Sequence, residues 1–221
     1  MAIPPSSRHS RKKDNVRRLP ATGGSSLLSL GIGAGASGPM GRLKKTVVMI
    51  GMMGAGKTAV GTALARYLAV PFLDSDDEIV SAANRSIAEI FERDGEAFFR
   101  AREAEVLARL LRGTPCILST GGGAFLPAGN RQMIHEAGIS IWLRADVELL
   151  WQRVRHKTTR PLLRTANPRE TLNALTLARE PLYASADLVV DSDADLSVDQ
   201  MAQRVAQALV TRPDVLDGEP V

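Results

Sequence analysis

The sequence predicts an α/β fold built around a parallel sheet of five strands. Five short apolar runs alternate with segments in which apolar residues recur at helical spacing, a pattern typical of parallel sheets flanked by helices. A glycine-rich loop joins the first run to the first helix, and polar or glycine residues follow the second and third runs directly, where such sheets bind ligands. The predicted strands are residues 46–50, 70–73, 116–119, 139–143 and 188–190.

The first predicted strand leads into the loop Gly51-Met52-Met53-Gly54-Ala55-Gly56-Lys57-Thr58, called the phosphate loop below. It fits the pattern G-x-x-x-x-G-K-[ST], with a β-branched strand before it and an amphipathic helix after it. The glycines let the backbone wrap closely around an anion, and the N–H groups of the loop and of the helix N-terminus then point at phosphate oxygens. Lys57 can reach the β- and γ-phosphates, and the Thr58 hydroxyl can bind Mg²⁺. The loop therefore predicts a nucleotide phosphate site.

The elements in the middle of the chain follow from periodicity. The second strand ends at Asp74-Ser75-Asp76, and helical patterns follow over residues 79–80, 87–91 and 98–111. The third strand runs into Gly121-Gly122-Gly123, called the glycine segment below. A helix predicted over residues 127–137 stops at Gly138. The apolar face expected for the first helix is Val60, Leu64, Tyr67 and Leu68.

The last elements are marked by capping residues. Asp146 is placed to cap a helix over residues 147–154, and a polar, basic stretch from Arg155 to Pro161 follows with little to bury. The next helix opens with Asn167 as the N-cap, a proline at the first position and a glutamate three residues after the cap. Ser197 and Gln200 frame a capping box for the last helix. Its expected apolar face is Val198, Met201, Val205 and Leu209.

The charge of the chain is divided unevenly. Residues 1–45 hold nine Lys or Arg residues and one Asp, a net charge of +8, so the rest of the chain carries a net charge of −4. This leaves the domain with no general basic surface for nucleic acid. No apolar run approaches the ~20 residues of a membrane span, and the single cysteine, Cys116, lies in an apolar run typical of a buried thiol.

We expect one domain over residues 46–211, with disordered segments at 1–45 and 212–221. The first segment is rich in Pro, Ser, Gly and basic residues and has no regular periodicity. An organellar transit peptide is the alternative that its acid-poor composition leaves open, whereas its apolar part is too short and glycine-broken for a secretory signal. Translation could also start at Met40.

Three features indicate a second, anionic substrate beside the nucleotide. Asp74 and Asp76 flank one residue after a strand, so in extended chain both carboxylates would point the same way; an acidic turn or a helix cap is the alternative. The glycine segment permits close approach to a ligand, or forms only a flexible turn. Arg100, Arg160 and Arg179 are isolated arginines that can grip a carboxylate or phosphate through two hydrogen bonds, although any one of them could be a surface residue.

Together these residues resemble the shikimate kinase family over nearly all of residues 46–210. The likeness implies a three-layer P-loop kinase fold like that of nucleoside monophosphate kinases, with a five-stranded parallel sheet, a helical substrate-binding segment over about 74–112 and a mobile lid over about 153–166. The matching segments are Gly-Met-Met-Gly-Ala-Gly-Lys-Thr (51–58), Phe-Leu-Asp-Ser-Asp (72–76), Ile-Phe (90–91), Phe-Phe-Arg-Ala-Arg-Glu (98–103), Gly-Gly-Gly (121–123), Arg-Pro-Leu-Leu (160–163) and Arg-Glu-Pro-Leu-Tyr (179–183).

The resemblance also implies a set of site residues. Lys57, Asp76 and Arg160 would be catalytic. Mg²⁺ would be the cofactor, bound by Thr58 and, through water, by Asp74. ATP would contact Gly54, Ala55, Gly56, Lys57, Thr58, Ala59, Arg153 and Arg160, and shikimate would contact Asp76, Arg100, Gly121, Gly122, Gly123 and Arg179.

The implied reaction is transfer of the ATP γ-phosphate to the 3-hydroxyl of shikimate, a step of aromatic amino acid biosynthesis. The resemblance implies a monomeric, cytoplasmic enzyme. Its expected partners are these two small molecules, with neither nucleic acid nor membrane. Two other functions stay open. A gluconate-kinase-like sugar-acid kinase also joins a phosphate loop to arginines, and a nucleotide-binding regulator would lack transferase activity. Comparing turnover with shikimate and with gluconate distinguishes the first alternative from shikimate kinase. ATP consumption that depends on an added acid distinguishes a kinase from the regulator.

Overall fold

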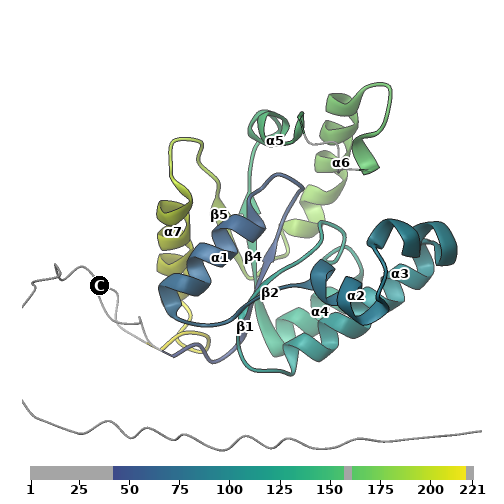
Figure 1. The fold of residues 1–221 in the computed structure, drawn as a ribbon. Helices are drawn as coiled ribbons and strands as arrows, with labels where there is room; N and C mark the ends of the chain where they lie inside the picture. Colours follow the sequence, from purple (N-terminus) through teal and green to yellow (C-terminus); the bar gives the residue numbers. More distant parts are fainter. Residues whose placement is uncertain (1–41, 157–160, 218–221) are drawn as a thin grey trace, which may run out of the picture. The chain divides into compact units, whose positions relative to one another are not determined.

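The computed structural model describes residues 42–156 and 161–217, and the first predicted disordered segment lies almost wholly outside them. Strands and helices alternate along the described chain as the sequence predicts (Figure 1). The strands are β1 (Thr46–Ile50), β2 (Phe72–Asp74), β3 (Ile117–Ser119), β4 (Gly138–Arg144) and β5 (Leu188–Asp191). The helices are α1 (Lys57–Leu68), α2 (Ser75–Ala83), α3 (Ile87–Leu111), α4 (Ala128–Ala137), α5 (Val147–Val154), α6 (Pro168–Tyr183) and α7 (Val198–Val210), with a 3₁₀ turn at Pro161–Leu163.

The five strands form one parallel sheet in the order β2-β3-β1-β4-β5. All five residues of the central strand β1 are buried, which requires helices on both faces of the sheet. Helix α1 packs against α7 on one face, whereas α2, α3 and α4 gather on the other (Figure 1). The strand order changes direction at β1, so the loop after β1 lies where open α/β sheets bind ligands.

Several predicted elements and their ends are confirmed. Strand β1 and helix α5 have the predicted bounds, and Asp146 Oδ1 accepts a hydrogen bond from Leu149 N at 2.7 Å as the cap of α5. Ser197 and Gln200 form the predicted capping box of α7. Within the predicted face of that helix, however, Val198 is 46% exposed. It lies in the first turn of α7, whereas Met201, Val205 and Leu209 are buried as predicted.

The prediction that Asp74 and Asp76 point the same way from an extended chain is wrong. Strand β2 ends at Asp74, and helix α2 begins at Ser75. Asp74 is the N-cap of α2, because its Oδ1 accepts a hydrogen bond from Asp76 N at 3.0 Å. The two carboxylates therefore belong to different structures, one to the cap and one to the first helical turn.

The two helical patterns at 87–91 and 98–111 belong to one element, α3, which bends at Gly95. This residue has φ 82° and ψ 171°, a backbone conformation that interrupts the helix. Across the bend the rings of Phe91 and Phe99 lie 4.6 Å apart. The bend thus lets the two halves of α3 pack against each other beside Arg100, whose guanidinium lies over the Phe99 ring.

Residues just beyond both predicted domain boundaries pack together. Leu43 pairs with Leu216 in an isolated antiparallel bridge, and both side chains are buried. Val215 is buried as well, and Lys45 Nζ lies 2.9 Å from Asp214 Oδ2. The packed domain therefore includes residues 42–45 and 212–217, which contact each other. Within the described residues, no helix is long and apolar enough to cross a membrane.

Candidate active site

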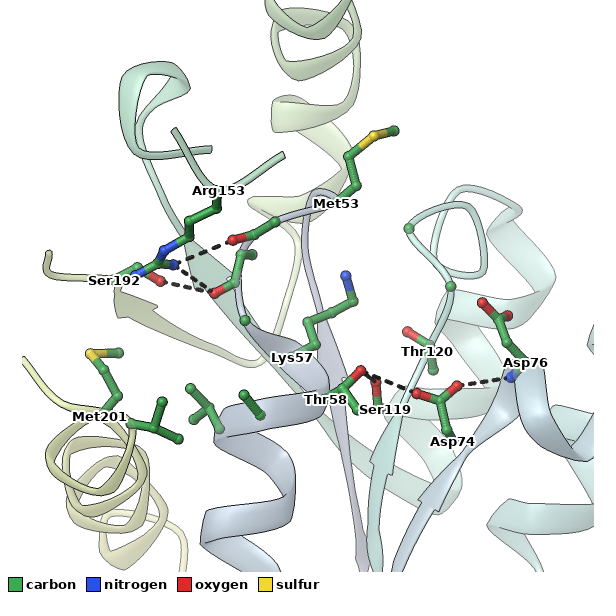
Figure 2. Close-up of a pocket in the computed structure, with 18 of the residues that line it drawn as sticks. Met53, Lys57, Thr58, Asp74, Asp76, Ser119, Thr120, Arg153, Ser192 and Met201 are labelled. Atoms are coloured by element: carbon green, nitrogen blue, oxygen red, sulfur yellow. Dashed lines mark hydrogen bonds between the residues drawn. The ribbon is translucent and has the colours of Figure 1, made fainter. Parts of the chain in front are cut away.

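The phosphate loop wraps a cleft of about 470 Å³ at the carboxyl ends of the strands (Figure 2). Gly54 and Gly56 have φ values of 86° and 96°, which side chains rarely adopt. A Cβ at Gly54 would lie only 2.7 Å from Val154 Cγ1, so glycine also allows α5 to approach the loop. The lining residues are Met53 to Val60, Asp74, Asp76, Ser119 to Gly122, Arg153, Ser192, Leu196, Val198 and Met201.

Two cations flank the phosphate loop. Lys57 Nζ donates hydrogen bonds to Gly51 O at 2.9 Å and Met52 O at 3.1 Å. Arg153 Nη1 lies 3.3 Å from Gly54 O and 3.4 Å from Ala55 O. Figure 2 shows Arg153 at one end of the cleft, Asp76 at the other and Lys57 between them. The positive charge is thus concentrated where a polyphosphate would lie along the loop.

Oxygen groups gather beside the start of α1. Thr58 Oγ1 is 3.3 Å from Asp74 Oδ2 and 3.3 Å from Ser119 Oγ. Hydroxyl and carboxylate oxygens are the donors that Mg²⁺ prefers, and this ion usually takes only one or two protein groups, with waters and phosphates as its other ligands. Thr58 and Asp74 therefore fit the predicted Mg²⁺ site. Sequence reasoning missed Ser119, although its place at the end of the third strand was a signal for it.

The glycine segment brings together the residues predicted to bind the second substrate. A Cβ added at Gly121 would lie 2.8 Å from Asp76 Oδ1, and one at Gly123 would lie 2.6 Å from Arg100 Nη1. At Gly122 it would lie 3.5 Å from Arg179 Nη1. Each glycine thus faces one of three charged side chains from three different elements. A side chain at Gly121 or Gly123 would displace the group opposite it.

Arg100 is held by a carboxylate that sequence reasoning missed. Arg100 Nη1 is 2.8 Å from Glu103 Oε2 and Nη2 is 3.2 Å from Glu96 Oε1. Burial raises the pKa of Glu103, and the neighbouring Arg100 opposes this shift. Spacings of three and four residues on one helix were the available signals for both pairs.

One predicted site residue cannot be placed, and one residue without a predicted role lies in the site. Arg160 and most of the polar stretch before it lie outside the described residues, so the predicted lid arginine has no described position. Tyr183, which carried no predicted role, donates a hydrogen bond to Gly122 O. Its signal was its place four residues after Arg179 on one helix face.

A parallel sheet, a phosphate loop and a second group of charged residues at the neighbouring glycine segment define a phosphate-loop kinase of small molecules. Residues 53–210 match the model of the family described as shikimate kinase. This chain belongs to the shikimate kinase family, whose members are ATP-dependent kinases.

Individual relatives agree with this assignment. The chain is 71% identical to a shikimate kinase of Cereibacter sphaeroides over 180 residues, which cover 81% of this chain and 90% of the relative. A solved shikimate kinase from Acinetobacter baumannii in complex with shikimate is 39% identical, with a TM-score of 0.72 over 76% of this chain and 93% of that one. A gluconokinase from Sinorhizobium meliloti 1021 is 15% identical, with a TM-score of 0.52 over 77% of this chain and 94% of that one, and shares the fold alone.

Proposed function

We propose that this protein transfers the γ-phosphoryl group of ATP to the 3-hydroxyl of shikimate, giving shikimate 3-phosphate and ADP. The observation that carries the proposal is the meeting of Asp76, Arg100 and Arg179 at the glycine segment, beside the phosphate loop. This arrangement offers two cations for a carboxylate and one carboxylate for hydroxyl groups. A hydroxylated acid is the acceptor that such a set of groups recognises.

ATP would lie along the phosphate loop. The backbone N–H groups of residues 54–59 would point at the phosphate oxygens, and Lys57 would exchange its two carbonyl contacts for the β- and γ-phosphates. Arg153 would keep its place against the loop and meet the adenine. The contacts of Arg153 with two loop carbonyls support this proposal, since they hold its guanidinium in the lining of the cleft beside the phosphate loop.

Shikimate would lie against the glycine segment. Arg100 and Arg179 would bind its carboxylate, and Asp76 would accept hydrogen bonds from its ring hydroxyls, including the one that attacks the phosphoryl group. The close approach of all three side chains to Gly121–Gly123 supports this proposal, because a side chain on this segment would fill the space that the ring needs.

Mg²⁺ would be held by the Thr58 hydroxyl directly and by Asp74 through water. When bound, the ion neutralises charge on the phosphates. The distance of 3.3 Å between Thr58 Oγ1 and Asp74 Oδ2 supports this pair as its protein contacts. Arg160, on a lid over about residues 153–166, would add charge beside the transferring phosphoryl and help to exclude water.

The experiment is a coupled ADP-release assay with ATP and shikimate. We expect ADP release that depends on shikimate and exceeds the release with gluconate by orders of magnitude. Equal or faster release with gluconate would favour a sugar-acid kinase, and ATP binding without acid-dependent release would favour a regulator. We also propose a monomer that works in the cytoplasm, and light scattering and cell fractionation test these two points.

A further inference from the structure

One buried hydroxyl group lies where the two substrate sites meet and has no role in the mechanism above. Tyr183 is 1% exposed, and its Oη donates a hydrogen bond to Gly122 O at 2.5 Å. Met52 Sδ of the phosphate loop lies 3.9 Å from the same oxygen. The ring of Trp142 in β4 lies 6.0 Å from the tyrosine ring. A single side chain thus contacts the phosphate loop, the glycine segment and the sheet.

Arg179 reaches the same carbonyl from the same helix. It precedes Tyr183 by four residues on α6, so both side chains lie on one helix face. Arg179 Nη1 is 3.4 Å from Gly122 O, a long hydrogen bond compared with the 2.5 Å of the phenol. The phenol therefore makes the shorter contact with this carbonyl, and the guanidinium makes only a long one.

Gly122 has close neighbours, so it matters whether Tyr183 or Arg179 donates to its carbonyl. A Cβ at Gly122 would lie 3.5 Å from both Arg179 Nη1 and Gly51 O, and 3.8 Å from Tyr183 Oη. Gly122 is partly buried and lies between α6 and the start of the phosphate loop. A carbonyl that is partly shielded from water needs a donor, because an unsatisfied one is costly.

We propose that Tyr183 is a positioning residue for acid binding. Its hydroxyl satisfies Gly122 O, and this leaves the guanidinium of Arg179 directed at the carboxylate of the acceptor. Without the hydroxyl, the carbonyl draws Arg179 onto itself and competes with the substrate for it. The inference rests on the proposed function, because it takes Arg179 to be a partner of the shikimate carboxylate.

The phenol is in the form that this role requires. Burial raises the pKa of Tyr183, since it disfavours the phenolate, and the nearby Arg179 opposes the shift. Tyr183 is therefore a neutral donor throughout the physiological pH range, and its bond to Gly122 O persists under the conditions of an ordinary assay.

The test is Tyr183→Phe, which removes the hydroxyl and keeps the ring. We expect KM for shikimate to rise about 5- to 20-fold, whereas kcat and KM for ATP stay within about twofold and the melting temperature hardly moves. Tyr67→Phe is the matched control, because Tyr67 is the other tyrosine of the chain and lies on α1. An unchanged KM for shikimate in Tyr183→Phe would overturn the inference, as would an equal loss of kcat and of ATP affinity.

A double variant separates action through Arg179 from a general structural effect. In an Arg179→Ala background, Tyr183→Phe should weaken shikimate binding no further, because the group that the hydroxyl positions is gone. If the losses in shikimate binding caused by the two substitutions were additive, the inference about Tyr183 would be overturned. The proposed function would still stand if the wild-type protein used shikimate. A wild-type protein that releases no ADP with shikimate would overturn both together.

Discussion

Arg100 and Glu103 form an ion pair one turn apart on α3, with Nη1 2.8 Å from Oε2. The carboxylate side is 2% exposed and the guanidinium side 30% exposed, so the pair spans the boundary between core and cleft. Glu96 contacts the same guanidinium from the solvent side. Arg100 is thereby held beside Gly123, with Nη1 bonded to Glu103 and both Nε and Nη2 bonded to Glu96. The second N–H groups of Nη1 and Nη2 are those that could meet a substrate.

Glu103→Gln should change how stability depends on pH. Burial raises the pKa of Glu103, so the folded protein binds this proton more tightly than the unfolded chain does. The contribution of the carboxyl to stability is therefore fully present below the unfolded pKa, near 4.5, and is lost as pH rises through the higher folded pKa. The melting temperature of wild type minus that of Glu103→Gln should therefore fall as pH rises above about 4.5. Glu105→Gln, an exposed neighbour on the same helix, should show no such trend. A difference that stays constant with pH would contradict the prediction.

Arg100→Lys should bind shikimate weakly although it keeps the charge. An ammonium group is a point charge and cannot serve Glu103 and a substrate carboxylate with one planar fork. A hydrogen bond to a charged group is worth about 1.5–3 kcal/mol, which corresponds to roughly 10- to 150-fold in affinity. Calorimetric titration with shikimate measures the loss. Arg102→Lys, an exposed arginine on the same helix, is the control, and an unchanged affinity in Arg100→Lys would place Arg100 outside the site.

Local signals explain why much of the fold was predictable. The capping residues Asp146, Ser197 and Gln200 mark helix ends through contacts within a few residues, and the phosphate loop is defined by eight consecutive residues. Asp76 was misplaced because a residue after a strand can continue it or start a helix. The run of acids at Asp76 to Glu78 was a helix-start signal that favours the observed structure.

Other features depend on contacts between distant parts of the chain. Leu216 is buried because Leu43, near the other end of the domain, pairs with it, and neither lies in a periodic pattern. The bond between Tyr183 and Gly122 likewise joins α6 to a loop after β3. Such pairings follow from the tertiary fold, so one sequence alone could not predict them.

Removal of residues 1–39 should leave the domain unchanged, whereas a substitution at Leu216 should destabilise it. A chain that begins at Met40 keeps Leu43 and should match the full-length protein in melting temperature and turnover. Leu216→Ala should lower the free energy of unfolding by about 2–5 kcal/mol, because it removes buried methyl groups and leaves a cavity. Thermal unfolding and an activity assay compare the two chain lengths, and urea unfolding measures the loss in Leu216→Ala. Leu177→Ala is the control, because Leu177 is 62% exposed, and a large fall in stability on removal of residues 1–39 would show that this segment contributes to the fold.

The last prediction separates phosphoryl transfer from substrate binding by comparing Arg160 with Arg179. If Arg160 meets the phosphoryl group mainly as charge develops during transfer, Arg160→Ala should lower kcat by about 10³–10⁵, by analogy with arginines in other phosphate-loop enzymes. Its effect on the affinity for shikimate and ATP should be modest. Arg179→Ala should instead raise KM for shikimate, because the carboxylate loses its partner in ground state and transition state alike.

Steady-state kinetics and calorimetry on the two variants measure kcat and both affinities. Arg66→Ala is the control, since Arg66 is an exposed residue of α1 that pairs with Asp199. If Arg160→Ala weakened shikimate binding while kcat at saturation survived, Arg160 would belong to the acid's binding site and not to the lid. The charge beside the transferring phosphoryl would then have to come from Lys57, whose Nζ already lies within hydrogen-bonding distance of the loop that would hold the phosphates.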